Sequence, residues 1–187
     1  PDKNIEEELS DIMRVIEEIE NLTKLNIIIQ DNIKEKFWDM FIIDSLIGNT
    51  DRHNGNWGFL VNTRSSKAEF SPIYDCGSCL NSKLADEEID EFNDVKIKNL
   101  AINCHSCIKE NGKKINYMPY IKSLKNEDCN NALLRNSTKI NLEKINEFIN
   151  NISCISINRK EFYKKIIGIR YKILEDSYKK LSINKRG

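Results

Sequence analysis

Three side chains in the first half of the sequence could together bind a metal ion and move a proton: Asp51, Asn56 and Asp75. Asp51 and Asn56 lie five residues apart in "GNTDRHNGNWGF", and Asp75 follows in "YDCG". Carboxylate and amide oxygens suit Mg²⁺, a hard cation that keeps water and substrate phosphates as its other ligands. The remaining carboxylate can orient an attacking hydroxyl and accept its proton. These residue types therefore indicate phosphoryl transfer.

The order and spacing of these residues match the catalytic loop of protein kinases. In H-R-D-x-x-x-x-N the Asp is the base and the Asn holds a metal ion, and the Asp of a later D-F-G holds another. Here Asp51 and Asn56 keep the spacing of five, and Asp75-Cys76-Gly77 keeps the pattern D-x-G. A loop rich in Asn, Asp and Gly is also an ordinary turn whose side chains bond to local backbone, so this alternative stays open.

An apolar helix is expected before this loop and a β-hairpin after it. The helix begins near Asp31, a good N-cap, and ends at Gly48. The segments "NWGFLVN" and "AEFSPIYD" read as strands with the turn-like "TRSSK" between them, which predicts a hairpin over residues 56–75. Such a hairpin would bring Asp75 back to the loop before it.

The rest of the chain is expected to be mostly helical. Apolar spacing predicts a helix over residues 5–20. The middle, residues 81–136, reads as helical or irregular, with "LAINCHSCIKE" as helix and "KENGKKINY" as a turn. Two C-terminal helices begin at Asn141 and at Asn158, which opens a capping-box pattern. Their predicted apolar faces are Leu142, Ile145, Phe148 and Ile149, and Phe162, Ile166, Ile169 and Ile173. The predicted fold class is α+β, mostly α-helical, in a single domain over residues 1–187 with a central β-hairpin.

Composition restricts the function classes. The chain has 187 residues, 40% of them hydrophobic and 31% charged, and its 29 basic and 29 acidic residues give zero net charge. Nothing global therefore indicates direct nucleic-acid binding. No apolar run is long enough to span a membrane, and the acidic start does not read as a signal peptide. The six cysteines are expected to be reduced thiols, and a cytoplasmic location is expected.

Residues 37–80 resemble a known kinase family. "FWDMFIIDSLIGNTDRHNGNWGFL" and "FSPIYDCGSCL" are similar to the C-terminal kinase lobe of HipA-like serine/threonine protein kinases, the toxin kinases of bacterial toxin–antitoxin systems and their relatives. The resemblance implies that Asp51 is the base for the acceptor hydroxyl and that Asn56 and Asp75 bind Mg²⁺. It also implies ATP and Mg²⁺ as cofactors, a protein substrate and a DNA-binding antitoxin as partner.

Other residues of the motif have two interpretations each. His53 could orient Asp51 or touch the transferred phosphoryl group, or it could bond to local backbone. Arg52 could stabilise phosphate charge, or it could form a salt bridge, which we favour. Trp57 and Phe59 are expected to be core residues, and Tyr74 is expected to pack beside Asp75.

The cysteines offer a zinc-site interpretation from another class. Cys76-x-x-Cys79 and Cys104-x-x-Cys107 are separated by 24 residues, and four thiolates at such spacing can hold structural zinc, with His105 as a substitute ligand. The kinase resemblance already accounts for the first pair, and the second lies in a segment that reads as helix. Free thiols are therefore favoured over a zinc module with four cysteine ligands.

The segment before Asp51 lacks the phosphate-binding parts of a kinase. The seven glycines build neither G-x-G-x-x-G nor a P-loop, and no strand like V-A-I-K precedes the loop. The chain thus resembles a C-terminal lobe whose N-terminal nucleotide-binding lobe is missing, and alone it is expected to bind Mg·ATP weakly. Two further alternatives stay open: a lobe of a phosphoinositide-type lipid kinase, whose loop is also D-R-H-x-x-N, and a non-catalytic kinase-like binding module.

Overall fold

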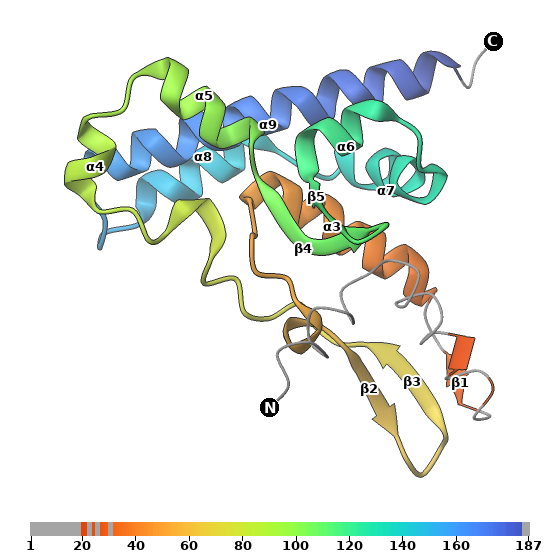
Figure 1. The fold of residues 1–187 in the computed structure, drawn as a ribbon. Helices are drawn as coiled ribbons and strands as arrows, with labels where there is room; N and C mark the ends of the chain where they lie inside the picture. Colours follow the sequence, from red (N-terminus) through yellow and green to blue (C-terminus); the bar gives the residue numbers. More distant parts are fainter. Residues whose placement is uncertain (1–19, 22–23, 25–26, 30–31, 185–187) are drawn as a thin grey trace.

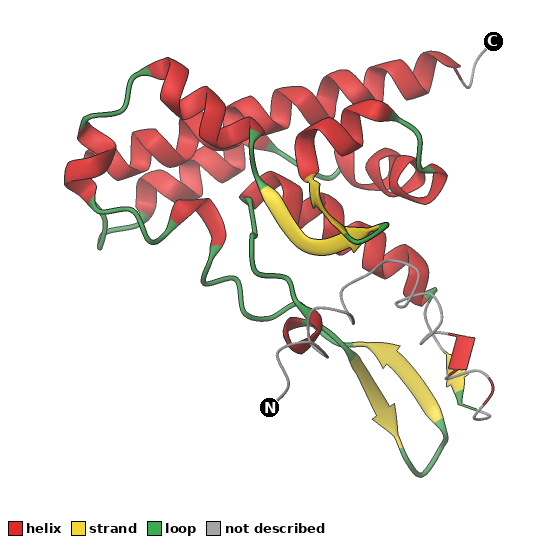
Figure 2. Cartoon of the chain, in the orientation of Figure 1, coloured by secondary structure: helices red, strands yellow, loops and turns green. Residues whose placement is uncertain are grey.

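The computed structural model describes residues 20–21, 24, 27–29 and 32–184. Figure 1 shows the long helix α9 (Ile157–Asn184) running along one side of the molecule, with most other helices gathered against it. The strands form two small hairpin-containing sheets, one close to these helices and one projecting from them (Figure 2). The helix expected over residues 5–20 lies outside the described residues, apart from Glu20.

The helix that leads into the candidate site is α3 (Ile33–Ile47). Its N-cap is Asn32, whose side chain accepts a hydrogen bond from Glu35 N at 3.2 Å, so the predicted cap at Asp31 is wrong by one residue. Its C-cap is Gly48, as predicted, with the left-handed φ of 68° that a residue without a Cβ adopts most easily. Nine of its residues are buried, which makes α3 the central helix of the core.

The predicted hairpin after the loop is confirmed. Strands β2 (Phe59–Asn62) and β3 (Lys67–Phe70) pair antiparallel, with Phe59 opposite Phe70. Both are shorter than expected, and the chain leaves the sheet before Pro72, which cannot donate to a strand ladder. Asp75 therefore lies in the irregular segment after β3. The sequence did not predict β1 (Ile28–Ile29), which pairs parallel with β3.

The middle of the chain contains a second hairpin. After α4 (Asp86–Asp90) and α5 (Asp94–Ile102), the chain forms β4 (His105–Glu110) and β5 (Lys113–Asn116). The helix expected over "LAINCHSCIKE" is therefore wrong beyond its first residues. The expected turn is confirmed at Asn111-Gly112, which both have positive φ, as type I′ hairpin turns require.

Four helices complete the chain: α6 (Tyr117–Ser123), α7 (Glu127–Ser137), α8 (Leu142–Asn151) and α9. The cap of α8 at Asn141 is confirmed by a hydrogen bond from Lys144 N. At the start of α9 the accepting side chain is Ser156, and the predicted cap at Asn158 is wrong.

Two clusters of buried side chains hold these elements together. The larger joins α3 to β4, β5 and helices α6 to α9, and includes Phe41, Tyr117 and Ile167. The smaller joins α4 and α5 to α9 through Ile89, Ala101 and neighbours. The predicted apolar faces are confirmed at Ile149, Phe162 and Ile166, but Phe148 is 70% exposed, so its assignment to the core was wrong. Within the described part of the chain, no helix is both long and apolar enough to cross a membrane.

Candidate functional site

The loop after α3 is anchored by the buried side chain of Asn49. Its amide nitrogen donates to Asp44 Oδ1 at 3.2 Å, and its Oδ1 accepts from Asp51 N at 3.0 Å. Ser78 Oγ donates to the same Oδ1 at 2.9 Å, and Tyr117 Oη donates to Asn49 O at 2.7 Å. The backbone of Asp51 is thus fixed by contacts to α3, to α6 and to the segment after Asp75.

A fully buried ion pair lies beneath this loop. Arg52 Nε donates to Asp44 Oδ2 at 2.8 Å, and Arg52 Nη2 donates to Asp44 Oδ1 at 3.0 Å, so the pair is bidentate. Burial by itself lowers the pKa of Arg52, but the hydrogen bonds and charge of Asp44 raise it above its ordinary value. Arg52 is therefore a permanent cation that is held in place by Asp44. This is the salt bridge that we favoured from the sequence.

The same guanidinium joins the two halves of the candidate metal site. Arg52 Nη1 donates to Asn56 O at 2.6 Å and to Tyr74 O at 2.5 Å, and Nη2 contacts Cys76 Sγ at 3.5 Å. Asp75 lies between these last two residues in the chain. One buried side chain thus contacts the backbone of Asn56, the backbone of the residue before Asp75 and the side chain of the residue after it.

The two candidate metal ligands differ in exposure. Asn56 is buried, and its Nδ2 donates to Asp51 O at 2.8 Å, which orients its Oδ1 away from that bond. Asp75 is exposed and has a left-handed φ of 51°, uncommon for a residue other than glycine. One amide oxygen and one carboxylate are a donor set that fits Mg²⁺.

The candidate base Asp51 is exposed at the edge of the loop. A cysteine of strand β4 approaches it: Cys107 Sγ lies 3.1 Å from Thr50 O and 3.9 Å from Asp51 Oδ1. This contact was not predicted, because β4 was expected to be helix. Asn49 was expected to shape the loop, and the contacts above agree with that role. Asp44, Ser78 and Tyr117 were missed as supporting residues; the one signal in the sequence is an acid, Asp44, inside the largely apolar run "MFIIDSLI".

The remaining motif residues shape the loop. His53 Nδ1 accepts a hydrogen bond from Gly55 N at 3.0 Å. This agrees with the alternative in which His53 bonds to local backbone. Tyr74 is 45% exposed, and its hydroxyl donates to Gly55 O at 3.1 Å, so it braces the loop more than it packs. Trp57 is buried in the core, as predicted, and Phe59 packs on it with ring centroids 5.8 Å apart.

The four cysteines of the zinc interpretation do not converge. The described residues include all four and contain no group of three or more His, Cys, Asp or Glu side chains that could hold a metal ion. Cys104 is buried in the core, whereas Cys76 and Cys79 lie after the hairpin β2–β3. Burial raises the pKa of Cys104. Burial and the neighbouring Cys76 together raise the pKa of Cys79 to about 12. These are the properties of protonated thiols.

Comparison with known proteins finds a kinase among the relatives of this chain. No protein-family model matches the chain. The chain is 42% identical over 142 residues to the serine/threonine-protein kinase CtkA of Helicobacter pylori, an alignment that covers 72% of this chain and 42% of that protein. The crystal structure of the H. pylori proinflammatory kinase CtkA matches with a TM-score of 0.77 and 36% identity, over 82% of this chain and 57% of that one. The chain therefore spans less than half the length of the curated relative, is homologous to it, and has a mostly helical α+β fold that matches a kinase structure.

Proposed function

We propose that the chain serves in Mg²⁺- and ATP-dependent transfer of a phosphoryl group to Ser or Thr of a protein, as the catalytic-loop part of a HipA-like kinase. The observation that carries the proposal is a pair of hydrogen bonds: one Arg52 nitrogen, Nη1, donates both to Asn56 O and to Tyr74 O. It makes one rigid unit of the loop with Asp51 and the segment with Asp75. The homology to CtkA supports the same activity.

Each residue of the unit has one task in this proposal. Asp51, exposed beside a fixed backbone, accepts the proton of the acceptor hydroxyl. Asn56 Oδ1 and the Asp75 carboxylate hold Mg²⁺, which, when bound, neutralises charge on the phosphates of ATP. Arg52 and His53 act as positioning residues through their bonds to the loop backbone. A DNA-binding antitoxin partner is proposed on the family resemblance alone.

The metal site can be tested with Mn²⁺, a paramagnetic substitute for Mg²⁺. In the presence of a non-hydrolysable ATP analogue, Mn²⁺ should broaden the amide NMR signals of residues around Asn56 and Asp75. The substitution Asp75→Asn should abolish this broadening, because it removes the charged ligand. Asp176→Asn, an exposed Asp to Asn change on α9, is the matched control and should leave the broadening intact. Equal broadening in wild type and Asp75→Asn would make the chain a non-catalytic binding module.

The proton-transfer role of Asp51 needs a separate measurement. Transfer of labelled phosphate from ATP to a Ser/Thr protein should fall by about 10²-fold or more in Asp51→Asn, the usual contribution of a general base. Nucleotide-dependent broadening by Mn²⁺ should persist in this variant. Phosphoinositide vesicles offered in parallel should stay unlabelled, and labelling of lipid in place of protein would favour the lipid-kinase alternative.

A further inference from the structure

An open groove runs along helix α9 and takes no residue from the candidate functional site. Figure 1 shows α5 and α6 beside α9, and both helices pack on it. The groove has a volume of about 660 Å³, within the usual range of ligand pockets. Its floor is apolar and consists of one glycine and four isoleucines: Ile97, Ile102, Gly168, Ile169 and Ile173. The groove is therefore an apolar surface that the described part of the chain leaves uncovered.

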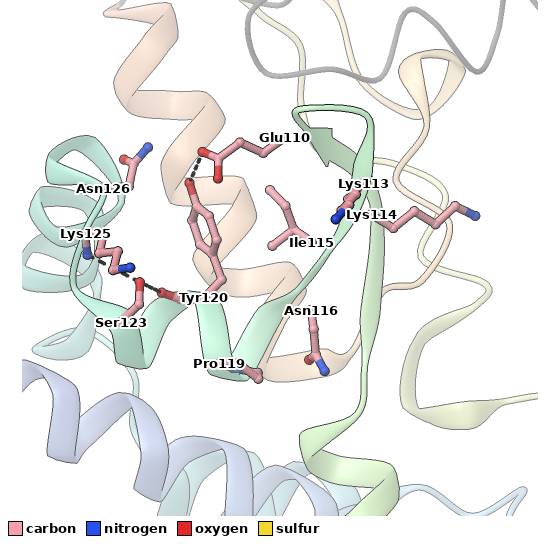
Figure 3. A pocket seen from close by; sticks show the side chains of 10 residues that line it. All are labelled: Glu110, Lys113, Lys114, Ile115, Asn116, Pro119, Tyr120, Ser123, Lys125 and Asn126. Atoms are coloured by element: carbon pink, nitrogen blue, oxygen red, sulfur yellow. Dashed lines mark hydrogen bonds between the residues drawn. The ribbon is translucent and has the colours of Figure 1, made fainter.

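A second cavity, beside the hairpin β4–β5, has a different character (Figure 3). Its volume is about 490 Å³, and polar side chains from both sides of it bond to one another. Tyr120 Oη donates to Glu110 Oε1 at 2.9 Å, and Ser123 Oγ donates to Tyr120 O at 2.6 Å. The acid and the hydroxyls of that cavity thus already have partners, whereas the floor of the groove on α9 lies open.

Lysines form the rim of the groove and hold their charges above the apolar floor. Lys165 pairs with Asp94, the acid of the lining, at 2.8 Å. Two further rim lysines pair with acids of α9 itself. Lys98 of α5 and Lys122 of α6 are exposed, and the side chain of neither bonds to any residue that the structure describes. Two unpaired positive charges therefore border the groove, on two different helices.

Gly168 lies in the interior of α9, where the described fold gives no packing reason for a glycine. A Cβ at this position would meet no atom within 4 Å. Glycine is less favourable than alanine inside a helix, so the residue costs stability. A glycine kept in a helix usually has a packing or functional reason. A second helix that crosses α9 at this point would supply one, because the missing side chain lets the two backbones approach closely.

We propose that this groove docks an acidic amphipathic helix of a partner protein. Apolar side chains of the partner at positions i, i+3 or i+4, and i+7 would contact the isoleucines, and acids on its flanks would pair with Lys98 and Lys122. From Lys165 to Ile173 helix α9 advances by about 12 Å, which is enough for about two turns of the partner. Because the two cations belong to different helices, a ligand with several acids suits them better than a lipid with one head group. The inference does not depend on phosphoryl transfer.

The test selects peptides from a displayed library on the purified chain. Each peptide has about four helical turns, with leucine at the anchor positions and either Glu or Lys at every other position. We expect the selection to enrich Glu. A synthetic copy of the enriched sequence, measured by fluorescence anisotropy, should bind about 3- to 10-fold more tightly than the same peptide with Gln in place of Glu. This is the size of two exposed charge interactions.

Variants of the chain locate this binding on the groove. Gly168→Leu places a side chain on the floor and should weaken the binding of the peptide by about 10-fold or more. Its midpoint of thermal unfolding should stay at or above that of wild type, because the space is open. Lys98→Gln/Lys122→Gln should erase the preference for Glu over Gln. Lys139→Gln/Lys144→Gln, the same loss of charge at exposed positions outside the groove, should retain it.

Three results would overturn the proposal. The first is a selection that enriches no peptide, or that enriches Lys. The second is an enriched peptide that binds Gly168→Leu as tightly as wild type. The third is displacement of the peptide by an equal concentration of laurate, which would assign the groove to a fatty acid.

Discussion

At the scale of single residues, Arg52 has the most contacts within the candidate site, since it binds Asp44, Asn56 O and Tyr74 O. We expect Arg52→Ala to lower the free energy of unfolding by about 3–5 kcal/mol, because it leaves the buried Asp44 carboxylate without a cation, with Asn49 as its remaining side-chain donor. The carbonyls of Asn56 and Tyr74 lose their donor in the same step. Urea unfolding followed by circular dichroism measures the loss. For a domain of ordinary stability this is a large fraction of the total.

Two other variants make the Arg52 prediction specific. Arg135→Ala removes a partly exposed ion pair with Asp39 and should cost about 1 kcal/mol or less. Arg52→Lys keeps a cation near Asp44 but cannot supply the bidentate pair and the hydrogen bonds to the two carbonyls together. Its loss in the free energy of unfolding should therefore lie between those of Arg52→Ala and Arg135→Ala. An Arg52→Ala variant no less stable than Arg135→Ala would contradict the role assigned to the buried pair.

The candidate site residues have a local signal in the sequence, whereas the residues that support them do not. Asp51, Asn56 and Asp75 follow from spacing, since a motif preserves its order along the chain. Asp44 does not, because its role depends on a partner eight residues later and on burial, neither of which a local pattern reveals. The strands beside the site illustrate the same limit: the Asn111-Gly112 turn was recognised, yet the apolar residues before it read equally well as helix.

At the scale of elements, Gly48 is the junction between α3, α9 and the loop. A Cβ at Gly48 would lie 2.2 Å from Arg170 Nη1, and its φ of 68° disfavours any other residue. Arg170 cannot move easily, since it is buried and donates to Ala101 O at 3.0 Å at the end of α5. We expect Gly48→Ala to destabilise the fold by about 2–4 kcal/mol, a sum of backbone strain and overpacking.

Gly168 of α9 provides the matched control for Gly48. A Cβ there would meet no atom within 4 Å, and a helical glycine costs about 0.5–1 kcal/mol relative to alanine. Gly168→Ala should therefore raise the midpoint of thermal unfolding, whereas Gly48→Ala lowers it. If both substitutions shifted the midpoint in the same direction, the close contact of Gly48 with Arg170 would not be decisive.

The link between α4 and α9 should be sensitive to acid. Hydrogen bonds from Ser156 and Arg159 lower the pKa of Asp86 below its ordinary 3.8. A carboxyl group with a lower pKa in the folded state stabilises that state above the ordinary value, and the contribution is lost as the pH falls through the lowered value. Asp86→Asn should thus reduce stability at pH 7 and flatten its decline below pH 4. Glu87→Gln, in the same turn of α4, should retain the wild-type decline in urea titrations at each pH.

At the scale of the whole molecule, the site is assembled from distant parts of the chain. Contacts join α3, the segment after β3, strand β4 and helix α6 around one loop. The α+β class, the first hairpin and the C-terminal helices could be predicted because each has a local signal. The meeting of β4 with Asp51 could not, because it joins residues more than fifty positions apart. The larger buried cluster joins α3 to α9, which explains why a change at Arg52 or Gly48 should affect folding and the candidate site together.

The proposed base and metal ligands follow a sequence that contains neither a G-x-G-x-x-G pattern nor a segment like V-A-I-K before Asp51. We therefore expect the 187-residue chain to bind Mg·ATP with a dissociation constant near or above about 1 mM, the weak end of usual kinase substrate affinities. Calorimetric titration with and without Mg²⁺ measures it, and Asp75→Asn should remove the Mg²⁺-dependent part. Micromolar affinity, or turnover near the roughly 1–100 s⁻¹ of complete kinases, would mean that this unit holds the phosphates without those two parts.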